Sequence, residues 1–156
     1  MILMYHKIDL DSPTIWWVTV NNFIRQMLEL QSYKIVYLDD YNPEDLKQVV
    51  ITFDGVYKNV LKFAAPQLKR LGYPFELFIS NDYIGKDNSF DINEPLCEFT
   101  SIQELKELTR YGARLQWHGK THQSLKNISD IEIIRTELEV PRQVREIDPN
   151  GFKWFA

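Results

Sequence analysis

The sequence is poor in cysteine and has no long hydrophobic run. Cys97 is the only cysteine among 156 residues, so an internal disulfide and a zinc site built from several thiolates are both excluded. No stretch of about 18 apolar residues occurs, and residues 1–6 lack the positive region and apolar core of a secretory signal peptide. The sequence therefore predicts no membrane insertion, and we expect a cytoplasmic protein.

Clusters of basic residues are also missing. The 18 Lys and Arg residues are outnumbered by 22 Asp and Glu, which gives a formal net charge of −4. A protein that binds a phosphate backbone by charge needs a basic surface, so we expect no nucleic-acid partner. No repeat or linker divides the chain, and we interpret residues 1–156 as one domain.

Short apolar runs alternate with helical patterns along the chain. The runs predict strands at residues 2–5, 35–38, 49–53, 75–79, 113–117 and 152–156. Strands that alternate with helices pair in parallel through right-handed crossovers, so the fold class is α/β, as a sheet or barrel. The last strand is cut after a few residues, which indicates a barrel that is incomplete at its C-terminus.

Capping residues give the expected limits of the helices. Thr19 is the expected N-cap of a first helix, and Gly72 closes a helix that starts near residue 60. Pro66 predicts a kink or a fresh first turn inside that helix. Residues 101–104 and 129–132 each have the form of a capping box.

Three weaker signals complete the outline. Asn42-Pro43 predicts a short helix, and either Asp39 or Asp40 is expected to serve as a cap. Pro141 should kink or end the last helix. The long polar loop at residues 81–99 is of a length that is usually functional or mobile.

Two strand ends carry the residues with chemical potential. Asp54 ends one buried strand, while His118 follows another and His122 comes four residues later. The carboxyl ends of parallel strands meet at one edge, where ligands collect. Neutral imidazoles bind Zn²⁺, Co²⁺, Ni²⁺ or Fe²⁺, and a carboxylate there can take the proton of an attacking water. We therefore predict a metal site with His118 and His122 as ligands and Asp54 as the catalytic base.

Structural interpretations of the same residues remain open. Asp54 could serve only as a helix cap, and His118 could cap its strand while His122 lies in solvent. His6, at the end of the first strand, is expected to be a core or loop histidine. The 13% of aromatic residues serve equally well as core or as sugar-stacking platforms.

These motifs resemble the polysaccharide deacetylase family, the NodB-like carbohydrate esterases of family four. Residues 52–57, Thr-Phe-Asp-Gly-Val-Tyr, are similar to the family motif Thr-Phe-Asp-Asp-Gly-Tyr, and His118 with His122 matches its His-(Ser/Thr)-x-x-His motif. The resemblance implies a distorted (β/α) barrel and a metal-dependent hydrolase, most often with zinc. The implied substrate is an N- or O-acetylated carbohydrate, in bacterial polysaccharide metabolism.

The sequence departs from the family motif at Gly55. Glycine occupies the place of the metal-binding aspartate, or else Asp54 is that ligand and the base is missing. In either alignment one carboxylate is absent, and Asp91 or Glu94 in the long loop is a possible substitute.

Two other functions compete with a deacetylase. The missing carboxylate favours a catalytically impaired carbohydrate-binding or interaction protein on the same fold. A metal-free glycoside hydrolase would pair Asp54 with Asp39 or Asp40. The sequence leaves the particular sugar, the identity of the metal and the oligomeric state open.

Overall fold

A parallel β-sheet forms the centre of the computed structural model, which describes residues 1–156. Its strand order is β1-β5-β6-β7, and the short β4 also pairs with β5. All pairs in this sheet are parallel, which confirms the predicted α/β class. The strands are β1 (Ile2–Tyr5), β4 (Lys34–Ile35), β5 (Gln48–Asp54), β6 (Phe75–Ile79) and β7 (Ala113–Trp117).

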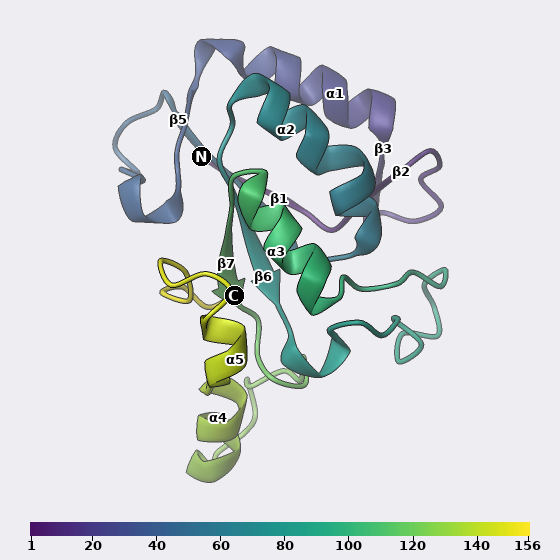
Figure 1. Cartoon of the computed structure of the whole chain (residues 1–156), viewed down its shortest axis with the longest axis vertical. Coiled ribbons are helices and arrows are strands. Elements are labelled where there is room, and N and C mark those ends of the chain that lie inside the picture. Colours follow the sequence, from purple (N-terminus) through teal and green to yellow (C-terminus); the bar gives the residue numbers. More distant parts are fainter.

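Helices follow the strands in sequence and form a layer along the sheet (Figure 1). In Figure 1, α1, α2 and α3 lie side by side, whereas α4 and α5 lie apart from them near the C-terminus. None of the helices has the length and hydrophobicity that a membrane crossing requires. The helices are α1 (Val20–Glu29), α2 (Ala65–Leu71), α3 (Ile102–Arg110), α4 (Ile131–Leu138) and α5 (Arg142–Arg145).

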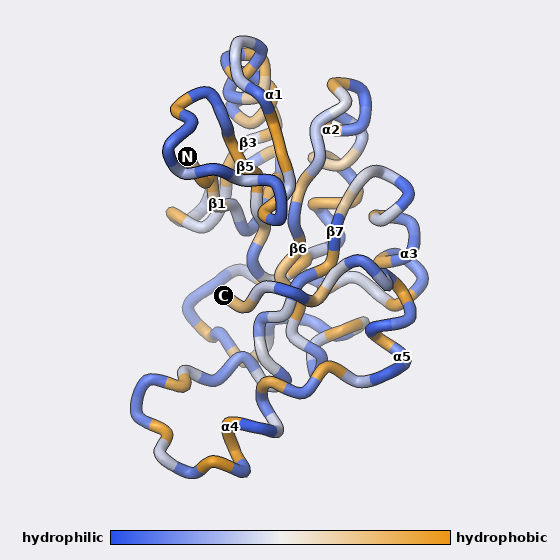
Figure 2. Tube along the Cα trace, turned by 90° about the vertical axis from the view of Figure 1, so that its left-hand side faces the viewer, coloured by the Kyte–Doolittle hydropathy of each residue, from blue (hydrophilic) through white to orange (hydrophobic).

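The hydrophobic core lies between the sheet and this helix layer. Every residue of β5 and β6 is buried, as expected for a parallel strand covered on both faces. Phe23 and Met27 of α1 and Leu105 and Leu108 of α3 join them in one core cluster. Figure 2 shows hydrophobic segments gathered where strands and helices meet, with hydrophilic residues on the connecting loops.

Several predicted helix limits are confirmed. The Thr19 hydroxyl accepts a hydrogen bond from the Asn22 amide at 3.3 Å, as an N-cap does. Residues 101–104 form the predicted capping box, and Gly72 ends α2 in the left-handed conformation with φ +70°. Pro66 lies in the first turn of α2, directly after a π-helical segment, Val60–Ala64. The predicted fresh first turn is therefore present.

Three local predictions are wrong. The strand expected at 35–38 is shorter, because the Leu38 amide donates to Glu76 Oε1 at 2.8 Å and a 3₁₀ turn, Leu38–Asp40, follows. Asn42-Pro43 opens a turn instead of a helix, and the Asn42 side chain accepts from the Glu44 amide. The N-cap of α4 is Asp130 instead of Ser129.

Two small strands were not predicted. β2 (Lys7–Asp9) and β3 (Trp17–Thr19) pair in parallel as a separate sheet. The expected last strand is present only as a parallel bridge between Trp117 and Phe155, although Phe152 and Ala156 also donate amides to β7. Residues 152–156 therefore lie along the edge of β7.

A buried polar network fixes this C-terminal segment. The side-chain amide of Gln116 in β7 donates to Glu76 Oε2 at 2.8 Å, and its oxygen, Oε1, accepts from the main-chain amides of Lys153 and Trp154. Both Glu76 and Gln116 have no exposed surface. Since Glu76 also accepts from Leu38, one pair of buried side chains holds both the 3₁₀ turn and the last residues against the sheet.

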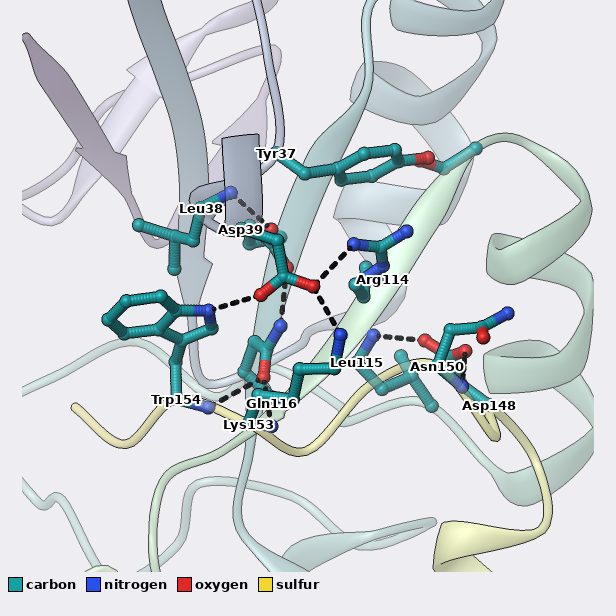
Figure 3. Close-up of polar contacts among 12 residues, drawn as sticks. Tyr37, Leu38, Asp39, Arg114, Leu115, Gln116, Asp148, Asn150, Lys153 and Trp154 are labelled. Atoms are coloured by element: carbon teal, nitrogen blue, oxygen red, sulfur yellow. Dashed lines mark hydrogen bonds and ion pairs between the residues drawn. The ribbon is translucent and has the colours of Figure 1, made fainter. Parts of the chain in front are cut away.

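Asp39 extends this network and is not the predicted cap. Its carboxylate accepts from the Trp154 indole at 2.9 Å and forms ion pairs with Arg114 and Lys153 (Figure 3). The guanidinium of Arg114 also stacks over the Tyr37 ring, 4.0 Å from its centroid. Asp39 therefore has a structural role in holding residues 153–154.

The network predicts a stability cost for Glu76→Gln. The new side-chain amide would place an N–H group against either the Leu38 main-chain amide or the Gln116 side-chain amide. Rotating the Gln116 amide to accept from it would remove the acceptor of the Lys153 and Trp154 amides. We expect a loss of about 1–3 kcal/mol in the free energy of unfolding, measured with urea. Glu107→Gln on the exposed face of α3 is the control, and an equal effect of the two substitutions would contradict the network's role.

Candidate active site

A cavity of about 310 Å³ lies at the carboxyl ends of the parallel strands. Residues at or just after four strand ends line it: His6 after β1, Asp54 at the end of β5, Ser80 after β6 and His118 after β7. The structure therefore brings Asp54, His118 and His122 to one cavity. The other lining residues are Lys7, Trp16, Gly55, Tyr57, Tyr83, Phe90, Asp91, Glu94 and Phe99.

The two predicted ligand histidines are neighbours. Their ring centroids are 4.8 Å apart. His118 Nδ1 lies 2.7 Å from the carbonyl oxygen of Ala156, which can only accept, so Nδ1 carries the proton and Nε2 is free. Desolvation lowers the pKa of both histidines, and His118 lowers that of His122 further. Both rings are therefore neutral near pH 7, the form that binds a metal.

Asp54 faces the same cavity and is only 8% exposed. Burial raises the pKa of its carboxyl to about 6, although His122 opposes the shift. The carboxylate accepts no hydrogen bond from the amides that follow it, so it does not cap the next helical turn. A carboxyl that titrates close to neutral pH is well suited to general base chemistry.

The backbone at Gly55 would strain a residue with a side chain. Its φ is +66°, a left-handed conformation that L-residues rarely adopt, and a Cβ there would lie 3.2 Å from Tyr57 Cε2. The Phe99 ring is the next neighbour, at 3.4 Å. Glycine at this position therefore agrees with the local backbone and ring packing.

Asp91 and Glu94 differ as possible substitutes for the missing carboxylate. Glu94 Oε2 accepts from Lys7 Nζ at 3.1 Å and from the Trp17 indole at 2.9 Å, so its charge is already paired. Asp91 lines the cavity, accepts no side-chain hydrogen bond and acts electrostatically on His122. Asp91 is therefore the freer of the two carboxylates.

The donor atoms fit a divalent cation in part. Two neutral imidazoles suit zinc, cobalt, nickel or iron. However, no group of three or more His, Cys, Asp or Glu side chains is arranged to hold a metal ion. The chain therefore offers two nitrogen ligands, and the third protein ligand usual in catalytic zinc sites is not in place.

His6 is the cavity residue that sequence reasoning missed, since we expected a core or loop histidine. Its ring lies 4.7 Å from that of Trp16, and burial, with Lys7 nearby, lowers its pKa to about 4. Its position at the end of β1, next to β5, was the available signal. Neither Asp39 nor Asp40 lines the cavity, so the carboxylate pairs that we considered for a glycoside hydrolase, Asp54 with Asp39 or Asp40, are not assembled.

Aromatic rings form one wall of the cavity. Tyr57 stacks on Phe99 with centroids 4.3 Å apart, and Tyr83 packs against both Phe90 and Phe99. The Phe90 ring lies 5.7 Å from that of His122. The aromatic content of the sequence therefore supplies both the core and this wall.

Comparison with protein families identifies one model. The polysaccharide deacetylase model matches residues 41–156. A search of curated protein sequences found no match.

Several solved structures share the fold at low sequence identity. Streptococcus pyogenes deacetylase PplD in complex with acetate has a TM-score of 0.76 and 19% identity over 99% of this chain and 71% of its own. IcaB from Ammonifex degensii has a TM-score of 0.71 and 15% identity, over 99% of this chain and 72% of its own. The Bacillus cereus polysaccharide deacetylase BC0361 has a TM-score of 0.66 and 20% identity, over 99% of this chain and 56% of its own.

The raised pKa of Asp54 predicts a pH-dependent effect of Asp54→Asn in chelator-treated protein. The folded pKa of about 6 exceeds the ordinary value of 3.8, so the folded chain holds this proton more tightly than the unfolded chain. The resulting stability is complete below pH 3.8 and is lost as the pH rises through 6. In urea unfolding, the free energy of unfolding of Asp54→Asn should rise relative to that of the wild type by on the order of 1–3 kcal/mol between pH 4 and pH 8.

Asp11→Asn, at an exposed position, is the control and should show no such gain. If the free energies of unfolding of Asp54→Asn and the wild type differ by the same amount across this pH range, the result would contradict the burial of the charge.

Proposed function

Because this chain belongs to the polysaccharide deacetylase family, we propose that it hydrolyses the acetyl group of an N- or O-acetylated sugar with the aid of a divalent cation. One observation carries the proposal. Asp54, His118 and His122, which are far apart in the sequence, line a single cavity at the carboxyl edge of the sheet. This combination provides a base and two metal ligands within one site.

His118 and His122 would hold the cation through their ring nitrogens. His118 is prepared for this role, because its bond to Ala156 leaves Nε2 free. Zinc is our first choice, and cobalt, nickel and iron suit the same ligands. When bound, such an ion polarises an acyl oxygen and makes water more acidic.

Asp54 takes the proton of the attacking water in this proposal. Its pKa of about 6 leaves it largely ionised at neutral pH but still basic enough to accept a proton. The Tyr57 amide is our candidate for stabilising the oxyanion, because it donates to no backbone carbonyl. The neighbouring amides of Lys58 and Thr100, in contrast, donate to the carbonyl oxygens of Glu98 and Val56.

The aromatic wall supports a sugar as the substrate. Stacked Tyr57, Phe99 and Tyr83 rings present apolar surface beside the polar groups, as sugar-binding sites require. The cavity of about 310 Å³ suits one acetylated sugar unit. We expect the substrate to come from bacterial polysaccharide metabolism.

A catalytically impaired carbohydrate-binding protein is the second candidate. The absence of a complete three-ligand group and the glycine at position 55 favour it. In that case the same cavity would bind the acetylated sugar, and His118 and His122 would contribute nothing to turnover. Sugar binding without turnover, unchanged in a variant with both histidines replaced by alanine, would support this function.

Zinc content and acetate release together test the proposed function. We expect Asp54→Asn to retain zinc but to release acetate from N-acetylated oligosaccharides about 10² to 10⁴ times more slowly. His122→Ala should lose both zinc and activity. Metal content is measured by mass spectrometry after dialysis, and acetate by an enzymatic assay.

Asp11→Asn should match the wild type in both measurements. A wild-type chain that binds no divalent metal and releases no acetate from any acetylated sugar would end the deacetylase proposal.

A further inference from the structure

Glu137 is buried in an otherwise exposed helix. It is 2% exposed and is the only buried residue of α4, whereas the apolar Ile131, Ile133 and Leu138 of the same helix face solvent. Surface helices usually bury their apolar residues and expose their charges. The contacts of this carboxylate therefore require an explanation other than hydrophobic packing.

The carboxylate of Glu137 binds the segment between the two cavity histidines. Its Oε2 accepts from the amides of Lys120 and Thr121, both at 2.9 Å. Its Oε1 accepts from Thr121 Oγ1 at 2.8 Å and from Gln123 Nε2 at 3.0 Å. Four hydrogen bonds to a charged acceptor make a strong and directional attachment.

The main chain of Glu137 adds a fifth contact. Its carbonyl oxygen accepts from the Trp117 indole at 2.7 Å, and Trp117 immediately precedes His118. The contacts of one residue therefore extend from the end of β7 to Gln123. Together they attach the segment that carries His118 and His122 to α4 on both sides of each histidine.

This segment has a backbone that needs external support. Gly119 has φ +85° and His122 has φ +61°, which is uncommon for a residue with a side chain. A Cβ at Gly119 would lie only 3.1 Å from Glu137 Oε2. The close approach of Glu137 therefore depends on glycine, and the turn depends on Glu137 to satisfy its amides.

From these contacts we propose that Glu137 is a positioning residue for the cavity histidines. It holds residues 118–123 in the turn that places the two imidazoles 4.8 Å apart, so that both rings can bind one cation. Glu137 does not line the cavity and forms no hydrogen bond to either imidazole ring. This inference rests on the proposed metal-dependent function for its consequence, but the turn itself can be tested without metal.

Co²⁺ binding to the full chain is the first test. Glu137→Gln removes the negative charge and, whichever way the new amide turns, places an N–H group against two of the four donors, so we expect Co²⁺ affinity to fall about 10- to 100-fold. The visible absorption bands of bound Co²⁺ should change as well, because the imidazole geometry changes. Thr121→Val removes one of the four bonds and should produce a smaller loss.

Glu139→Gln is the matched control, since Glu139 is exposed two residues further along the chain. Circular dichroism at the assay temperature verifies that each variant is folded. Wild-type affinity and absorption bands in folded Glu137→Gln would overturn the proposal.

Hydrogen exchange of the metal-free protein separates this inference from the proposed function. The amides of Lys120 and Thr121 should exchange faster in Glu137→Gln than in Glu139→Gln, whether or not the chain binds metal. Unchanged exchange would overturn the positioning role. If the wild type binds no Co²⁺ but these amides still exchange faster in Glu137→Gln, the metal-dependent function is ruled out and the positioning role is supported.

Discussion

The parallel register of β1, β5, β6 and β7 is the constraint on which the site depends. Tyr5 pairs with Phe53 at one border, and Ile79 pairs with Trp117 at another. Neighbouring strands therefore end at the same level, and whatever residue follows each strand reaches the same cavity. Residues separated by more than a hundred positions in the sequence become neighbours because main-chain hydrogen bonds align the strand ends.

The sequence predicted most of what this constraint requires. The apolar runs before Asp54 and His118 correspond to β5 and β7, and the Thr19 and Gly72 caps are where their chemistry requires them. These signals are local, because a buried strand or a cap depends on a few adjacent residues. The placement of Asp54 and His118 in one cavity followed from the parallel arrangement, whereas His122 reaches that cavity through the turn after β7.

Features that depend on distant partners could not be predicted. Leu38 leaves the strand pattern because Glu76 accepts its amide, and no local residue indicates that bond. Asp39 resembles a cap, yet it pairs with Arg114 and Lys153 far along the chain. Glu137 lies in a helix that leaves apolar residues exposed, and its burial follows from the turn that it contacts.

The site combines a supported pair of histidines with an incomplete set of carboxylates. The chain supplies two neutral imidazoles and a turn whose amides are satisfied by Glu137. Directly after Asp54 it has Gly55, whose φ of +66° would strain a residue with a side chain. The central claim is therefore that the two imidazoles suffice to hold a cation beside Asp54.

Zinc K-edge X-ray absorption of the full chain, loaded with one equivalent of Zn²⁺, tests that claim most directly. The account predicts scattering from two imidazole rings, with Zn–N distances of about 2.0–2.1 Å, and oxygen atoms in the remaining positions. A spectrum without imidazole scattering would contradict it.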